Sequence, residues 1–134
     1  MKNISKYYPL SILVMIAIVW LSLGNPPDSN LKYIANIDKI VHFCMYGGLT
    51  MVIWFEYLLH HDSLEWKKLV LFALLAPIVF SGAMEIAQKV LTIYRQADWA
   101  DFLANSLGVL CGLLVALLII RPVVWAVRKK GSKC

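Results

Sequence analysis

The sequence predicts an all-α, polytopic membrane protein folded as a four-helix transmembrane bundle, and three observations favour this fold class. Of the 134 residues, 60% are hydrophobic and only 16% are charged, whereas soluble domains average about 45–50% and about 25%. The mean hydropathy is +0.70. The apolar residues form continuous segments without the alternation of a transmembrane barrel. Each segment is therefore expected to be a helix, which satisfies its own backbone in lipid.

A single domain is expected over residues 1–134, and its four spans are expected at 7–23, 38–59, 69–91 and 99–120. The first is short for a bilayer that needs ~20 residues, and Tyr7 and Tyr8 would extend it into the headgroup layer. Lys2 and Lys6 precede it as in a signal peptide. No small-residue cleavage pattern follows, so this helix is expected to be retained.

Glycine, proline and alanine suggest how the later spans pack. In the second span, Gly47 and Gly48 should let another helix approach closely. In the third, Pro77 frees a backbone carbonyl and is expected to kink the helix. The fourth carries a stripe of small residues at every fourth position, which predicts close packing within the bundle. This stripe consists of Ala104, Gly108, Gly112 and Ala116.

The distribution of lysine and arginine predicts the orientation. Four spans place both termini on one side together with the second loop, and that side carries 9 of the 13 basic residues. The positive-inside rule then places both termini and the basic tail at 121–134 in the cytoplasm. The net charge of +5 is explained by this bias, and no basic face suited to nucleic acid is expected. The expected location is the cell (inner) membrane, which the chain is expected to cross several times.

Polar residues at membrane depth gather in the outer half of the predicted bundle. Shared helix faces follow from spacings of three, four or seven residues, which occur within three sets: Asp38 and His42; Glu85 and Gln88; and Asp98, Asp101 and Asn105. Ionisable groups in lipid usually face the bundle interior and pair with one another, which predicts one polar pocket open to the outside. The expected ligand-binding residues are Asp38, Lys39, His42, Glu85, Gln88, Arg95, Asp98, Asp101 and Asn105.

Structural explanations compete with this pocket. Asp38, Asp98 and Asp101 also suit helix N-termini, where an anion complements the helix dipole. Glu56, at the inner end of the second span, is expected to be interfacial. The loop residues His60, His61, Asp62 and Glu65 are expected to be solvated.

The ordered set Asp38-Lys39-x-x-His42, Glu85-x-x-Gln88, Arg95 and Asp98-x-x-Asp101-x-x-x-Asn105-x-x-Gly108 resembles the VanZ-like family. The resemblance spans roughly 38–112, and each short motif alone is weak. It implies a small multi-helix membrane protein of the bacterial envelope. The family is named for an accessory protein of glycopeptide resistance associated with teicoplanin, so an influence on glycopeptide susceptibility is one implication. The resemblance implies no biochemical mechanism.

Three functions are compatible with the pocket. In the first, which we favour, it binds a lipid headgroup or a lipid-linked cell-wall precursor. Basic groups would contact phosphate, and carboxylates would accept hydrogen bonds from hydroxyl or ammonium groups. In the second, a membrane-embedded hydrolase or transferase would use His42 or Glu85 as acid or base, with Asp101 a further catalytic candidate. In the third, the polar residues only fix helix register or dock partner membrane proteins.

A metal version of the enzyme would use His42, Glu85 and Asp101 as ligands. It is disfavoured because one histidine lies in the cluster and no HExxH motif is present. The sequence therefore predicts no metal and no other cofactor. The oligomeric state is left open.

Overall fold

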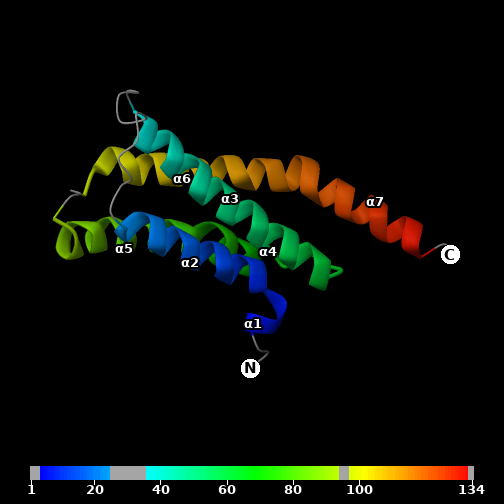
Figure 1. The fold of residues 1–134 in the computed structure, drawn as a ribbon. Helices are drawn as coiled ribbons and strands as arrows, with labels where there is room; N and C mark the ends of the chain where they lie inside the picture. The colour runs from blue at the N-terminus through cyan, green and yellow to red at the C-terminus, as the bar shows by residue number, and fades with distance from the viewer. Residues whose placement is uncertain (1–3, 25–35, 94–96, 133–134) are drawn as a thin grey trace.

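The computed structural model describes residues 4–24, 36–93 and 97–132, and every regular element in these ranges is helical (Figure 1). Two of the helices, α4 and α6, run continuously through π-helical segments, marked η, into α5 and α7. The elements in chain order are α1 (Ile4–Tyr7), α2 (Pro9–Leu23), α3 (Ile37–His60), α4 (Trp66–Leu69), η2 (Val70–Leu75), α5 (Ala76–Leu91), α6 (Trp99–Val115), η3 (Ala116–Ile120) and α7 (Arg121–Gly131).

Two continuous helices of the described chain are long and apolar enough to cross a bilayer. They cover Trp66–Leu91, with 26 residues, and Trp99–Gly131, with 33 residues, while α2 is apolar but shorter. Many large apolar side chains face outward on these helices, a surface that suits lipid better than water. Examples are Trp20, Val79, Val90, Trp99 and Leu118. The all-helical class is confirmed and two spans are supported, whereas four membrane spans stay a prediction.

The helices pack with alternating direction. α3 has its largest contact with α6, α2 lies against α3 and α5, and α5 lies against α6. One end of the assembly contains the start of α3, the end of α5 and the start of α6 (Figure 1). At the other end, the Tyr7 ring meets the His60 ring edge-on at 5.2 Å between centroids. The described chain thus begins beside the end of α3.

Glycines set the close approach of α3 to α6. A Cβ placed on Gly108 would overlap the carbonyl oxygen of Phe43, and one on Gly112 would lie 2.5 Å from the carbonyl oxygen of Gly47. Only glycine therefore lets the two backbones meet at this distance. The close packing predicted for the small-residue stripe is therefore confirmed at Gly108 and Gly112. The prediction for Gly48 is wrong, since a Cβ there would meet nothing within 4 Å.

Each π-helical segment ends just before a proline. η2 ends at Leu75, two residues before Pro77, and η3 ends at Ile120, two residues before Pro122. Proline has no N–H to donate and crowds the preceding turn, so the helix must widen or bend there. The Ala76 N–H accordingly donates to Leu71 O, five residues back. The disturbance predicted at Pro77 takes the form of this wider turn.

The predicted basic tail is a helix over most of its length. α7 continues α6 and η3 as far as Gly131, so the helix runs well past the predicted end of the fourth span at residue 120. Arg128 donates to the carbonyl oxygens of Leu58, Leu59 and His61 at the end of α3. These bonds satisfy helix-terminal acceptors and fix α7 against α3.

Candidate functional site

A buried polar network joins α3, α5 and α6 through His42, Glu85 and Asn105, which are 4%, 6% and 0% exposed. Asn105 Nδ2 donates to Glu85 Oε1 over 3.3 Å, and Asn105 Oδ1 lies 3.0 Å from His42 Nδ1. His42 Nδ1 is also 3.6 Å from Glu85 Oε1. With its amide nitrogen turned to Glu85, Asn105 presents its oxygen to the imidazole. This arrangement favours a proton on Nδ1.

A more exposed ionic layer lies beside this network. Lys39 Nζ is 3.3 Å from Asp98 Oδ2 and 3.4 Å from Asp101 Oδ1. Asp98 is also the N-cap of α6, and its Oδ1 accepts from the Ala100 N–H at 2.9 Å. The Ala100 N–H, and then Lys39, hold the pKa of Asp98 below its ordinary value. Helix capping and a role in the cluster therefore coincide at Asp98.

Asp101 connects the two layers. One donor atom each from His42, Glu85 and Asp101 lies within 4.8 Å of the others. Glu85 Oε2 and Asp101 Oδ1 are buried and have no hydrogen bond of good geometry with any described residue. Two carboxylates and an imidazole thus face one another from three helices, a set that can bind a cation or exchange protons.

Helix geometry explains why these side chains meet. Lys39 and His42 are three residues apart on α3, and Asp98, Asp101 and Asn105 follow at helical spacing on α6, so each set shares a face. Phe43 follows His42 on α3, and Gly108 lies one turn after Asn105 on α6. The close contact between Phe43 and Gly108 therefore holds the two faces together. The sequence pattern therefore predicted the convergence of His42, Lys39, Glu85, Asp101 and Asn105.

Two of the expected site residues, Gln88 and Asp38, stand apart from the cluster. Gln88 is buried at 2% exposure, but its Nε2 donates to Ser22 O over 3.1 Å and ties α5 to the end of α2. Asp38 is exposed, and no hydrogen bond or ion pair joins it to the other described members. Arg95 lies outside the described residues.

Glu56 is a buried polar residue whose role sequence reasoning missed. It is 2% exposed, so the interfacial placement is wrong. Its carboxylate accepts from Leu10 N at 2.7 Å, Ser11 N at 3.0 Å and Ser11 Oγ at 2.6 Å. These amides are at the start of α2, where Pro9 is the first residue and Tyr8 supplies no side-chain cap. Glu56 thus caps α2 from another helix.

Tyr46 was also missed. It lies four residues after His42 on α3, and so on the same face. It is 1% exposed, and its hydroxyl has no hydrogen-bond partner among the described residues. The spacing from His42 is the sequence signal that could have found it.

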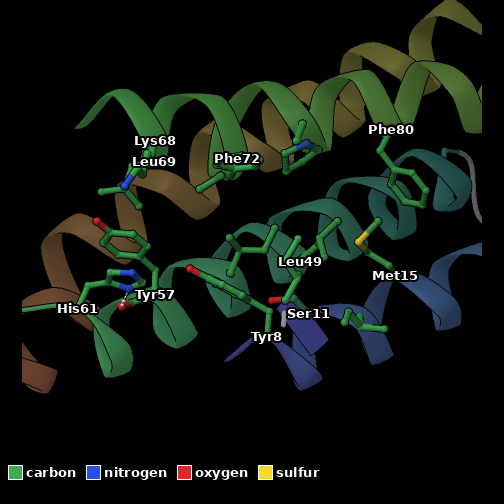
Figure 2. A pocket seen from close by; sticks show the side chains of 16 residues that line it. Tyr8, Ser11, Met15, Leu49, Tyr57, His61, Lys68, Leu69, Phe72 and Phe80 are labelled. Carbon is green, nitrogen blue, oxygen red and sulfur yellow. Dashed lines mark hydrogen bonds between the residues drawn. The ribbon is translucent and has the colours of Figure 1, made fainter. Parts of the chain in front are cut away.

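A separate cavity of about 330 Å³ lies between α2, α3 and the η2–α5 helix. Figure 2 shows Met15, Leu49, Phe72 and Phe80 pointing into it from these three directions. Its polar lining gathers near one end, which is formed by Tyr8, Tyr57, His61 and Lys68. This is the end that Glu56 and α1 share, so the cavity and the polar cluster are distinct.

Comparison with known proteins adds one finding. No curated protein and no solved structure matches the chain. A sequence model described as VanZ/LLP1 matches residues 2–121, a range that includes every residue of the polar cluster. The match covers most of the chain and agrees with the resemblance carried by the ordered polar motifs. The chain therefore belongs to the VanZ/LLP1 family.

Proposed function

We propose that this protein binds a lipid headgroup, or the headgroup of a lipid-linked cell-wall precursor, in its polar cluster. The observation that carries the proposal is the convergence of His42, Glu85, Asp101 and Asn105 from three helices, with Lys39 at the edge. Polar groups held among apolar helices cost free energy unless they pair or have a function. The buried carboxylate oxygens without a well-aligned hydrogen bond, Glu85 Oε2 and Asp101 Oδ1, support a binding role over a purely structural one.

The chemistry of the cluster suits a headgroup. Lys39 is partly exposed and offers an ammonium group to phosphate. Asp98 is half exposed beside it and can accept hydrogen bonds from sugar hydroxyls or an amine. Because the cluster lies at one end of the helices, its ligand would approach from the membrane surface with its acyl chains among the exposed apolar side chains.

The proposed setting is the bacterial inner membrane. Four spans, of which α2 and α3 would supply two, would place both termini in the cytoplasm and the cluster at the outer surface. The bias of 9 of 13 basic residues supports this orientation. An influence on glycopeptide susceptibility would then act through the headgroup that the cluster binds.

Lipid retention tests the proposal. The protein is extracted in a mild detergent, and lipid that remains bound is quantified by native mass spectrometry. The double variant K39M/H42A removes the ammonium and the imidazole of the cluster. We expect it to lose most of the retained lipid, because each charge-assisted contact to a headgroup contributes roughly 1.5–3 kcal/mol.

A matched control exists at the opposite end of the molecule. The double variant H60A/K68M removes the same two kinds of group from exposed positions, and it should retain lipid as the wild type does. Equal retention by wild type and both double variants would rule out the cluster as the headgroup site.

A further inference from the structure

We infer that His42, Glu85 and Asp101 bind one divalent transition-metal cation, of which Zn²⁺ and Mn²⁺ are the best suited. Each residue offers one donor atom, and all three atoms lie within 4.8 Å of one another. Bonds from such a metal to imidazole nitrogen and carboxylate oxygen are about 2.0–2.2 Å long, so two donors around one ion are separated by at most about 4 Å. Small side-chain rotations bring this set to that spacing.

The second observation is that two carboxylate oxygens of the cluster are buried without a well-aligned hydrogen bond. Glu85 is 6% exposed, and its Oε2 lies in the cluster with no well-aligned hydrogen bond to any described residue, although the backbone N–H of Asp98 is close. Asp101 Oδ1 is likewise buried, with Lys39 Nζ at 3.4 Å but poorly aligned. A buried carboxylate that is only weakly partnered is costly, and a cation bound between Glu85 and Asp101 would complete the pairing of both.

The charge balance favours the same conclusion. Within the described cluster, Glu85, Asp98 and Asp101 oppose the single ammonium of Lys39. This excess of carboxylates weakens the attraction of Lys39 for a phosphate. A divalent cation neutralises the excess and leaves coordination positions open, through which it would bridge the carboxylates to a phosphate oxygen. This bridging role rests on the proposed headgroup binding, whereas metal binding itself does not.

The donor set selects the class of metal. One imidazole with two carboxylates suits Zn²⁺ or Mn²⁺ better than Mg²⁺ or Ca²⁺, which prefer oxygen ligands alone. The absence of an HExxH motif is no objection, because here the ligands come from three helices.

The test uses the full chain without a polyhistidine tag, stripped with a chelator and equilibrated with Zn²⁺ or Mn²⁺. Elemental analysis should find about one ion per chain, and calorimetry should show at least a tenfold loss of affinity in E85Q and in D101N. The control variants D62N and H61A alter exposed or partly exposed groups at the other end, and they should bind as the wild type does. Equal binding by wild type, E85Q and D101N would overturn the inference.

X-ray absorption on the wild type keeps the inference testable if a variant fails to fold. The Zn²⁺-loaded chain should show nitrogen and oxygen ligands with one imidazole, and sulfur ligands from Cys44, Cys111 or Cys134 would overturn it. Lipid retention is then compared between stripped and loaded protein. Metal binding without retained lipid would leave this inference standing and reject the proposed function. Lipid retention without any bound metal would reject this inference and leave the proposed function standing.

Discussion

Glu56 shows how one side chain can hold two helices together. Both of its carboxylate oxygens are engaged, Oε1 by Leu10 N and Oε2 by Ser11 N and Oγ. The first amides of a helix have no partner within that helix. Because α2 contains no acidic residue in its first turn, a carboxylate from α3 takes the place of a local cap.

Replacing Glu56 should therefore destabilise the protein. Glu56→Ala leaves two amides and a hydroxyl without an acceptor, and we expect a loss of about 3 kcal/mol in the free energy of unfolding. Sodium dodecyl sulfate titration in mixed micelles measures it. Asp62→Ala, which removes an exposed carboxylate that pairs with Arg128, should change stability by less than about 1 kcal/mol. Similar losses in both variants would contradict the capping role.

At the residue scale, the sequence predicted that polar side chains of α3, α5 and α6 meet. His42, Glu85 and Asn105 were recognisable because an ionisable or amide group in an apolar helix needs a polar partner. The burial of Glu56 was not predicted because its partners are mainly backbone amides, which a pattern of side chains cannot reveal. Asp38 shares a face with His42 yet is exposed, because it lies in the first turn of α3, beyond the packed part of that helix.

The contact between α3 and α6 positions the site at the scale of whole elements. Phe43 and Gly47 on one helix meet Gly108 and Gly112 on the other. This contact lies next to His42 and Asn105, so the separation of the two backbones also sets the distance across the polar network.

Gly108→Ala should separate these helices. Its methyl group would collide with the Phe43 carbonyl oxygen, a backbone atom that cannot rotate away, and we expect a loss of about 1–3 kcal/mol in the free energy of unfolding. Gly48→Ala is the matched control, because its methyl group enters open space on the same contact helix. Without a clash, it should stabilise α3 by about 0.5–1 kcal/mol. A neutral Gly108→Ala would show that the helices are not held at this distance.

Element boundaries and helix contacts were predictable to different degrees. Continuous apolar runs indicated the helices, and small residues at every fourth position indicated a packing stripe. Gly47 and Gly48 are adjacent in sequence, and only the rotation of α3 about its axis determines which one faces α6. The wide turns before Pro77 and Pro122 could be foreseen as disturbances but not as π-helical segments, because a kink satisfies the same steric requirement.

The whole molecule has two chemically different ends. One carries the polar cluster, and the other carries Glu56, the cavity of Figure 2 and the bonds from Arg128 to the end of α3. The sequence predicted the gathering of polar residues at the first of these ends. It did not predict the cavity, which depends on how large apolar side chains on three helices fail to fill the space between them.

The orientation of these ends is testable by labelling with a membrane-impermeant maleimide. In a background in which all three native cysteines are serine, Ala97→Cys lies between α5 and α6 and should react in intact spheroplasts. Ser63→Cys lies between α3 and α4 and should react only after lysis, because the basic second loop is expected to stay in the cytoplasm. The opposite labelling pattern would invert the proposed topology.

The bonds from Glu56 to α2 also bear on biogenesis. The acceptor for the Leu10 amide is translated 46 residues after it, so α2 leaves the ribosome with its first amides open and must wait for nearly all of α3. A nascent chain arrested before Glu56 therefore carries an uncapped first helix, while one arrested after α3 can close the pair as a hairpin. In the proposed four-span topology, α2 and α3 would therefore insert as one unit, completed near the last turn of α3.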